Sequence, residues 1–395
     1  MNMFNAHVKV LSGDLLIEEM NRIGVAKEGQ EIMEPKMKFY ILKLENVPIK
    51  DAIILKQEAL SIGMDCAVAW NVVSLKVEKT DALLFGTKKQ FDFLSKKMFI
   101  QPFNGREISE EIDEAIKNFD AEYYIWKFSD ESIDLKKIKL MGVLNITPDS
   151  FSDGGKFIEK SNAIEHAKKM VEDGADIIDL GGESTRPYSK PVPANEEISR
   201  ISPLIDEIVS LPVPVSIDTY KPEVAEFALK HGVKIVNDIY ALRQEGMVEV
   251  VKRYSAGVVL MHMKGDPSNM QDNPIYENVV SDVIGFLRER ALYALGNGIR
   301  RDFIVMDPGI GFGKNVEHNI AILKELQSFK SLGFPILIGL SRKGFIGEIL
   351  KKNVNDRLIG SISSALYAAM NGANILRIHD VKETKEAIKI LEAIR

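Results

Sequence analysis

The sequence predicts an α/β protein, a (β/α)8 TIM barrel with an additional small N-terminal α/β domain. Eight short apolar runs, rich in Val, Ile and Leu and not alternating with polar residues, lie in the last two-thirds of the chain. Such runs are typical of parallel strands that are buried on both faces. Helical segments separate them, and the eight strand–helix units fill residues 139–395. Because a barrel of this kind takes about 250 residues, we prefer it to a doubly wound sheet, which usually has fewer units.

The spacing of apolar and glycine residues gives each barrel element a range. The expected strands span 140–147, 176–181, 213–218, 233–238, 256–262, 303–307, 335–340 and 374–379. The expected helices lie near 160–173, 195–210, 222–231, 246–254, 277–298, 316–329, 354–371 and 382–394. Gly174, Gly232, Gly298 and Gly372 each fall between a helix and the next strand, where a left-handed C-terminal cap is expected.

Residues 1–120 have a different pattern and are expected to form an accessory α/β domain of unknown role. Strands are expected at 39–42, 64–70 and 82–85, and helices at 12–23, 50–61, 88–97 and 107–118. No catalytic cluster stands out in this part of the sequence. Residues 121–138 are expected to be a connector whose aromatic residues pack between the two domains.

Composition excludes several classes of protein. With 45% hydrophobic and 27% charged residues, the chain has the balance of a soluble globular enzyme. Its net charge of −6 gives no basic field for nucleic acid or an anionic membrane. The single cysteine, Cys66, excludes an internal disulfide and fits a buried structural thiol. No apolar run approaches the 18 or so residues of a membrane span, and we expect a cytoplasmic protein.

Polar residues end all eight expected strands: Asn145, Asp179, Asp218, Asn237, His262, Asp307, Ser341 and the segment 377–380. A parallel barrel places these ends on one face, where its active site is built. Asp218, Asn237 and Asp307 could read the hydrogen-bonding edge of a flat heterocycle, since a carboxylate accepts two parallel N–H donors in a fork. The alternative is that each aspartate only caps its helix or satisfies loop amides.

A second group is cationic and predicts an anion site. Arg186, Lys343, Arg377 and His379 follow barrel strands, and Thr185 could add a neutral contact. The loops after strands 7 and 8 of such barrels commonly bind phosphate. Solvated loop charges are the alternative for Arg186 and Lys343.

Two glycine-rich segments are expected to shape the mouth of the barrel, which is the face at the C-terminal ends of its strands. The segment 309–314 (GIGFGK) fits neither a dinucleotide fingerprint nor a Walker loop, and it is expected to hold Phe312 over the mouth. The segment 151–155, which contains Phe151 and Asp153, has the composition of a glycine-hinged flap. We expect His262 to be packed or loop-bonded instead of acting as a general base.

The sequence gives little indication of a metal site, because it contains no H-E-x-x-H motif, no cysteine cluster and no EF-hand loop. Magnesium needs few protein ligands when substrate phosphates hold it. Asn145 could supply one oxygen to such a phosphate-bound Mg²⁺.

At these segments the sequence closely resembles the dihydropteroate synthase family. The matching segments are LNITPDSFSDGG (144–155), GGESTRP (181–187), SIDT (216–219), ND (237–238), LMHM (260–263), DPGIGFGK (307–314), SRK (341–343) and RIHDV (377–381). They occur in the family's order and span about 140–395. Gly344 and Phe345 depart from the residues that often follow the lysine in the family, and the N-terminal domain lies outside the minimal family domain.

The resemblance implies the family's reaction and the residues for it. The reaction joins 6-hydroxymethyl-7,8-dihydropterin diphosphate to 4-aminobenzoate, giving 7,8-dihydropteroate and pyrophosphate. By resemblance, Asp218, Asn237, Asp307 and Lys343 would hold the pterin, and Asn145 would ligate Mg²⁺. Thr185, Arg186, Arg377 and His379 would bind the diphosphate, and Pro187, Ser341, Phe312 and the Phe151 flap would frame the aminobenzoate. Met261 is also expected among the substrate contacts, with Asp218, Lys343 and Arg377 nearest the chemistry.

Two other functions compete with this interpretation. A pterin-binding methyltransferase, acting on a reduced folate and a corrinoid, would share the pterin-reading aspartates and asparagine but needs no diphosphate site. A non-catalytic pterin-binding protein would tolerate loss of the cationic residues, yet these are present. The family also implies a homodimer.

Overall fold

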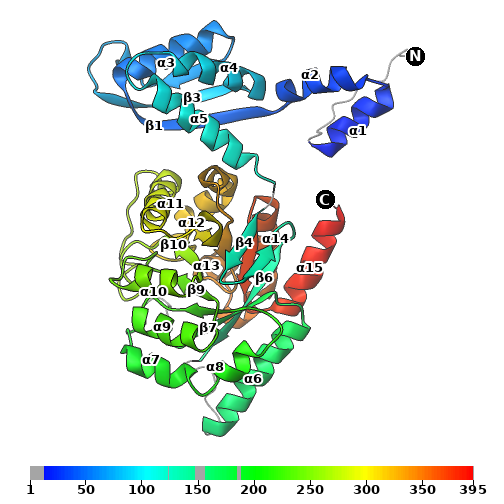
Figure 1. Ribbon diagram of the computed structural model, residues 1–395, viewed down its shortest axis with the longest axis vertical. Coiled ribbons are helices and arrows are strands. Elements are labelled where there is room, and N and C mark those ends of the chain that lie inside the picture. The colour runs from blue at the N-terminus through cyan, green and yellow to red at the C-terminus, as the bar shows by residue number, and fades with distance from the viewer. Residues whose placement is uncertain (1–12, 123, 147–155, 185–187, 395) are drawn as a thin grey trace. The chain divides into compact units, whose positions relative to one another are not determined.

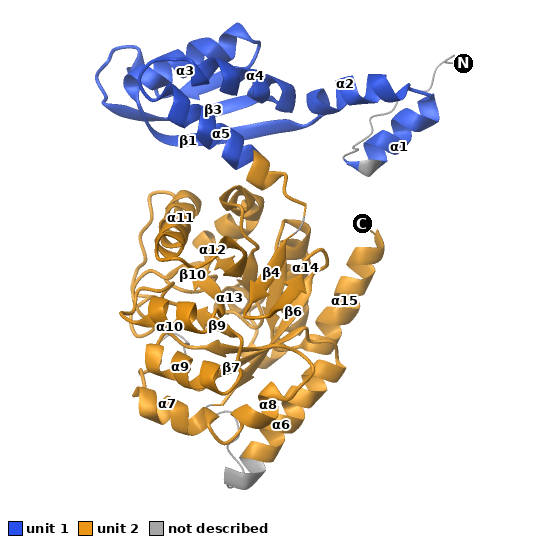
Figure 2. Cartoon of the chain, viewed as in Figure 1, with its two compact units in different colours: residues 1–116 blue, residues 117–395 orange. Residues whose placement is uncertain are grey.

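The computed structural model describes residues 13–122, 124–146, 156–184 and 188–394. The chain forms two compact units, Met1–Ile116 and Lys117–Arg395, which we describe separately (Figure 2). The boundary falls slightly before the expected one at residues 120–121. None of the described helices is long and apolar enough to cross a membrane. The cytoplasmic location stays a prediction.

The second unit is the predicted TIM barrel (Figure 1). Its strands are β6 (Lys139–Asn145), β7 (Ile177–Gly181), β8 (Val215–Asp218), β9 (Ile235–Asp238), β10 (Gly257–Met261), β11 (Ile304–Asp307), β12 (Leu337–Gly339) and β13 (Ile375–Ile378). They are parallel and pair in the order β11-β10-β9-β8-β7-β6-β13-β12. A parallel bridge between Met306 and Ile336 joins the two ends of this order. All eight predicted strands are therefore present.

Helices follow the strands around the outside of the barrel. They are α6 (Lys156–Glu172), α7 (Ala194–Ile201), α8 (Ile205–Val209), α9 (Pro222–Lys230), α10 (Met247–Arg253), α11 (Val279–Gly296), α12 (Val316–Lys324), α13 (Gly344–Leu350), α14 (Leu358–Met370) and α15 (Val381–Ile394). The helix expected at 195–210 is split in two, and Pro203, which has no N–H to donate, lies at the break. Helix α13 was not predicted, because Gly344 and Gly347 weaken the helical signal there.

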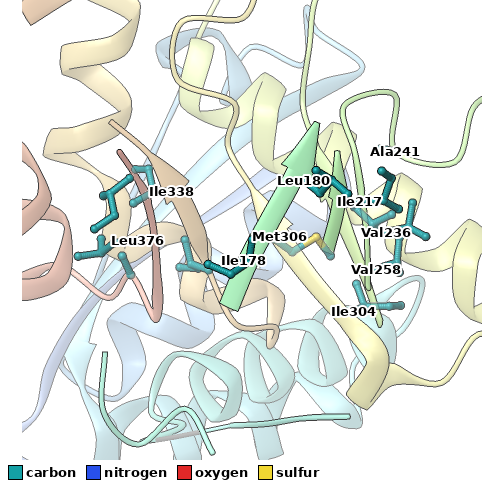
Figure 3. Close-up of a cluster of buried hydrophobic side chains, with 14 of the residues drawn as sticks. Ile178, Leu180, Ile217, Val236, Ala241, Val258, Ile304, Met306, Ile338 and Leu376 are labelled. Carbon is teal, nitrogen blue, oxygen red and sulfur yellow. The ribbon is translucent and has the colours of Figure 1, made fainter. Parts of the chain in front are cut away.

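Each barrel strand sends alternate side chains inward and outward. The outward ones pack beneath the helices in one large core, in which Ile178, Leu180, Ile217 and Val236 are fully buried (Figure 3). The inward ones form a second layer inside the barrel: Met141, Ile177, Ile235, Val259, Val305, Leu337 and Ile375. This two-layer burial explains why the strands read as continuous apolar runs.

A small hairpin completes the inner layer of the barrel. Strands β4 (Ile125–Phe128) and β5 (Glu131–Asp134) pair antiparallel. Trp126 and Phe128 are fully buried among the inward side chains, and the Trp126 indole donates to the Phe303 carbonyl at 3.0 Å. Trp126 and Phe128 of the expected connector therefore pack into the barrel. This corrects the expectation that they fill a space between two domains.

The first unit is a three-stranded antiparallel sheet with helices on one face. Its strands β1 (Phe39–Pro48), β2 (Asp65–Val68) and β3 (Lys79–Thr87) lie in the order β1-β3-β2. Its helices are α1 (Asp14–Ile23), α2 (Lys27–Met37), α3 (Ile49–Ser61), α4 (Lys88–Phe99) and α5 (Gly105–Phe119), the last of which runs into the second unit. Helix α2 was not predicted, since it buries no residue and contains Pro35.

The two faces of this small sheet differ in burial. Leu42, Leu84 and Cys66 lie in a core with residues from α3, α4 and α5. Cys66 is the buried thiol expected, and burial raises its pKa to about 11. On the opposite face Phe39 and Ile41 are 61% and 64% exposed. The end of this face at Phe39 and Ile41 is therefore apolar and largely exposed among the described residues, whereas Lys43 pairs with Asp81 further along it.

Candidate functional site

The polar residues at the barrel mouth come directly after the inward-facing core residues. Asp179, Asn237, Asp307 and Arg377 each lie two positions beyond a residue of the inner layer on the same strand. Because side chains alternate along a strand, all four point into the barrel. Asp218 follows the same rule from Ser216, whose side chain is fully buried on β8. The alternation therefore gathers the predicted Asp218, Asn237, Asp307 and Arg377, as expected.

Arg377 lies between two buried carboxylates. Its Nε donates to Asp179 Oδ2 and its Nη2 to Asp218 Oδ2, both at 2.6 Å. Asp179 Oδ2 also accepts from the Asn237 amide at 3.0 Å. One oxygen of each aspartate has no hydrogen-bond partner among the described residues. Arg377, predicted to bind an anion, is thus also the counter-ion of Asp218, predicted to bind the pterin. The sequence pattern did not indicate this pairing.

Burial and charge oppose each other in this group. Burial raises the pKa of Asp218 to about 7, although the Arg377 guanidinium pulls it down. Burial lowers the pKa of Arg377, but the Asp179 and Asp218 carboxylates outweigh it and raise that pKa above its usual value. Arg377 therefore stays charged, and its bond to Asp218 favours the ionised carboxylate against the effect of burial.

A second charged group surrounds Asp307 and Lys343. Burial raises the pKa of Asp307. Two interactions oppose this rise: the Gly309 N–H donates to Asp307 Oδ1 at 2.7 Å, and Lys343 is positively charged. Burial lowers the pKa of Lys343 to about 8, against the attraction of Asp307 and Asp218. The Lys343 ammonium lies 4.3 Å from the centre of the Phe312 ring, a cation–π contact. The predicted Asp307, Lys343 and Phe312 therefore meet at one place.

The remaining predicted residues border these groups. His379 Nδ1 forms a 3.0 Å hydrogen bond with Ser341 Oγ. The same hydroxyl oxygen accepts a hydrogen bond from the His379 backbone N–H at 3.2 Å. Met261 is buried in a cluster that includes Phe312. Arg342, next to these residues, instead forms a two-bond pair with Asp380. Predicted residues outside the described part of the chain are Phe151, Asp153, Thr185, Arg186 and Pro187.

Asn145 ends β6 next to this group. A Cβ built on Gly181 would lie 3.1 Å from Asn145 Oδ1 and 3.6 Å from the Cβ of Asp218, so Gly181 leaves the room in which these two side chains approach. The described residues contain no group of three His, Cys, Asp or Glu that could hold a metal ion. A single amide oxygen fits only a cation that takes most of its ligands from a substrate.

The structure shows three features that the sequence analysis missed. Asp179, noted only as a strand end, joins Arg377 to Asn237. Lys314 bonds His262 and backbone carbonyls. Lys221 forms ion pairs with both Glu183 and Glu197. For Asp179 the signal was present, because it ends a strand just as Asp218 does. For the lysines no local pattern reveals the partners.

His262 matches its expected role. It is buried, and burial, followed by the charge of Lys314, lowers its pKa to about 2. Its ring packs edge-on against Phe286, with the centroids 4.9 Å apart. A neutral, enclosed imidazole of this kind holds structure and does not accept substrate protons.

The chain is similar to known proteins over the barrel and, in one case, over nearly its whole length. The family described as pterin binding enzyme matches residues 141–379. The dihydropteroate synthase of Haemophilus influenzae is 43% identical over 266 residues, which are 67% of this chain and 97% of that protein. The bifunctional dihydropteroate synthase/dihydropteroate reductase of Helicobacter pylori is 34% identical over 391 residues, 98% of each chain. The Xanthomonas albilineans dihydropteroate synthase solved with 4-aminobenzoic acid has a TM-score of 0.66 and 40% identity, covering 69% of this chain and 98% of that one.

Proposed function

This chain belongs to the dihydropteroate synthase family of pterin-binding enzymes, and we propose that the charged group at its barrel mouth is the site of the family's reaction. The protein joins 6-hydroxymethyl-7,8-dihydropterin diphosphate to 4-aminobenzoate and releases pyrophosphate, a step of folate biosynthesis. The pterin-binding methyltransferase alternative finds no support in these relatives.

The observation that carries the proposed site is the meeting of Asp218, Asn237, Asp307 and Lys343 inside the barrel. Acceptors remain available, because one oxygen of Asp218 has no hydrogen-bond partner among the described residues. The Asn237 amide nitrogen donates to Asp179, which leaves its amide oxygen for a substrate. Two carboxylates and an amide oxygen match a pterin edge, which presents an exocyclic amine beside a ring N–H. Lys343 would complement the pterin carbonyl.

The diphosphate would lie toward Arg377 and His379. Arg377 uses Nε and Nη2 for the two aspartates, which leaves Nη1 for a phosphate oxygen. His379 is held by Ser341 and would supply a second donor. We also carry over from the resemblance Thr185 and Arg186 for the diphosphate, and Pro187, Ser341, Phe312 and the Phe151 flap for the aminobenzoate.

The chemistry follows from where charge develops. As the methylene–oxygen bond breaks, negative charge grows on pyrophosphate and positive charge on the pterin methylene. Fixed donors on Arg377 and His379 stabilise the first, and the Asp218 carboxylate stabilises the second. The arylamine then forms the new carbon–nitrogen bond and loses its proton. Because the carbon is strongly electrophilic, a weakly basic amine can attack it without a strong general base.

We propose Mg²⁺ as the cofactor, held by substrate phosphates and by Asn145. The single amide oxygen of Asn145 suits a cation that takes most of its ligands from the substrate. When bound, Mg²⁺ would offset the charge that builds on the leaving group. Removal of divalent cations by a chelator should raise the KM for the pterin substrate, and Asn145→Ala should raise the Mg²⁺ concentration needed for half-maximal rate.

A direct assay tests the proposed site. Purified protein with both substrates should release pyrophosphate only when 4-aminobenzoate is present. Asp307→Asn should weaken pterin binding by at least about tenfold, because an amide cannot accept two donors as a carboxylate does. Binding of a pterin within twofold of the parent protein would refute the placement of Asp307.

We further propose a homodimer formed through helix α14. This 13-residue helix has no charged residue, yet Ile359, Tyr367 and Met370 are 73%, 44% and 57% exposed. An exposed apolar stripe of this kind on a barrel enzyme is typical of an interface between identical subunits. Light scattering should give twice the chain mass, and Tyr367→Glu should give one chain mass; a monomeric parent protein would contradict this.

We propose dihydropteroate reductase as a second activity, carried by the first unit. The match to the Helicobacter pylori bifunctional protein covers this unit, whereas the match to the Haemophilus influenzae synthase covers only 67% of the chain. One end of the exposed face of the β1-β3-β2 sheet, at Phe39 and Ile41, offers apolar side chains for a flat ring, and the Lys43–Asp81 ion pair lies further along the same face. The reaction would add a hydride and a proton across the remaining C=N bond of the dihydropterin ring, and a reduced nicotinamide or flavin would donate the hydride.

This second activity has its own test. Full-length protein should oxidise a reduced nicotinamide or a reduced flavin when 7,8-dihydropteroate is supplied, and mass spectrometry should find a product two mass units heavier. A chain limited to residues 117–395 should keep pyrophosphate release and lose this oxidation. If both forms lack the oxidation with every donor, the first unit has another role.

A further inference from the structure

A buried ammonium group lies inside the loop that follows β11. Lys314 is only 2% exposed, although it is a lysine at the mouth of the barrel. Its Nζ lies 2.9 Å from the Gly309 carbonyl oxygen, 3.0 Å from the Phe312 carbonyl oxygen and 2.8 Å from His262 Nδ1. The loop 309–314 therefore closes around the end of its own last side chain.

These contacts satisfy the group that they bury. A buried ammonium is costly unless its three donors find acceptors, and here His262 Nδ1 and the carbonyl oxygens of Gly309, Phe312 and His262 surround it. Burial lowers the pKa of Lys314 well below its usual value, and the Asp307 charge opposes this. Gly309 and Gly313 have φ values of +70° and +63°, which turn the backbone so that the loop can fold inward. Because these protein acceptors take the three donors of Lys314, none is left for a substrate phosphate.

The same loop holds Asp307 of the proposed pterin site and carries Phe312 of the proposed aminobenzoate site. The Gly309 N–H, which donates to Asp307 Oδ1, belongs to the residue whose carbonyl accepts from Lys314. Phe312, whose carbonyl also accepts from Lys314, packs its ring below the Lys343 ammonium. Fixing these two carbonyls therefore fixes the direction of the Asp307 carboxylate and the position of the Phe312 ring.

We propose that Lys314 is a positioning residue for substrate binding, and that it acts with His262 by locking the loop 309–314 in the shape that presents Asp307 and Phe312. The inference rests on the pterin placement proposed above. The outer side of the loop is tied separately, since Gln271 donates to the Gly311 carbonyl and Tyr276 to the Gly313 carbonyl. These outer ties keep the loop in place when the inner one is removed, so the loss should be local.

Lys314→Met tests the proposal, because methionine fills the space without donors. The KM for the pterin diphosphate should rise at least about tenfold, while kcat changes by less than about threefold, because ground-state positioning is lost. The matched control is Ile208→Ala, a cavity in the fully buried part of α8 away from the mouth. Both variants are assayed at the same interval below their melting temperatures, and the control should leave the pterin KM within twofold.

Two His262 variants separate positioning from packing. Gln and Leu both remove the ring and have similar size, but only the Gln side chain offers Lys314 an acceptor. His262→Leu should raise the KM for the pterin diphosphate. The increase in log KM for His262→Gln should be at most half of the increase for His262→Leu. Equal KM values for these two, or a pterin KM within twofold of the parent for Lys314→Met, would overturn the proposal.

The Asp307→Asn variant keeps this test distinct from the site assignment. If Asp307→Asn weakens pterin binding and Lys314→Met does not, the pterin placement stands and the role of Lys314 is wrong. If Asp307→Asn has no effect, the pterin placement itself fails, and the proposal for Lys314 fails with it.

Discussion

Replacing Arg377 by methionine should destabilise the barrel as well as impair catalysis. The Arg377 guanidinium forms 2.6 Å bonds to Asp179 and Asp218, whose side chains are 0% and 6% exposed. Without the cation, two carboxylates would remain close together in a place that water hardly reaches. The sequence alone indicated only an anion ligand here, so a stability effect is a consequence of the structure.

The size of this effect can be worked out from the burial. Removing one partner of a buried ion pair costs about 3–5 kcal/mol. The Arg377 side chain is 20% exposed, so some solvation is already present and the low end applies, about 3 kcal/mol. At roughly 2–4 °C per kcal/mol for a domain of this size, the melting temperature should fall by about 6–12 °C.

The loss should depend on pH with a defined sign. The pKa of Asp218 is raised to about 7 by burial, and removing the opposing Arg377 charge raises it further. A carboxyl group whose folded pKa exceeds its unfolded value of about 3.9 favours folding in acid, and that contribution is lost as pH rises through the folded pKa. The variant should therefore lie closer to the parent protein at pH 6 than at pH 8.

The two tryptophans make the measurement specific to each unit. Trp126 is fully buried in the barrel, whereas Trp70 is 96% exposed in the first unit, so the large change in fluorescence reports barrel unfolding. Arg253→Met is the matched control, because Arg253 pairs with Glu226 at 2.7 Å on the surface, where such a pair contributes under about 1 kcal/mol. If Arg377→Met and Arg253→Met melted within 1 °C of each other at pH 8, the reasoning would be refuted.

Three further predictions concern the mouth and the unit boundary. The KM for the pterin diphosphate should rise between pH 7 and pH 9 with an inflection near 8, because Lys343, whose pKa is about 8, loses its charge there; Lys343→Arg, measured in the same buffers, should show no such inflection. Gly309→Ala should lower the free energy of unfolding by more than about 2 kcal/mol, because its Cβ would meet the His262 carbonyl oxygen at 1.9 Å and φ is +70°. Gly285→Ala, within α11 and in open space, should instead be neutral or stabilising by up to about 1 kcal/mol in the same urea titration. A chain limited to residues 117–395 should release pyrophosphate within about twofold of the full-length rate, whereas a cut after hairpin β4–β5 should give an unfolded barrel by circular dichroism.

The barrel could be predicted because its rules are local. Each strand is a short apolar run that ends in a polar residue, and each has a helix after it, so the eight strands were found within a few residues of their observed ends. The convergence of Asp218, Asn237 and Asp307 was predictable for the same reason. Strand ends of a parallel barrel lie on one face, and the two-residue period decides which side chains point inward.

The unpredicted parts depend on partners that are distant in sequence. The pairing of Arg377 with Asp179 joins positions 198 residues apart, and nothing near either residue indicates the other. The Trp126 hairpin looked like a linker, because burial inside a barrel leaves no periodic signal in a four-residue strand. Helix α13 begins with glycine, so its formation depends on packing by Phe345 and Ile346.

A common arrangement links the positioning groups at the mouth. Asp179 orients Arg377, the Gly309 N–H orients Asp307, and Ser341 orients His379, so each orienting group holds a residue that was predicted to touch substrate. A site that must bind a substrate with both a neutral ring and a charged diphosphate needs its donors and acceptors fixed before the substrate arrives, because reorienting them during the reaction would cost free energy. Sequence patterns identify the groups that face the substrate, since those follow strand geometry. The contacts that hold these groups follow only from three-dimensional packing, and that is why the positioning roles of Lys314 and Asp179 emerged from the structure.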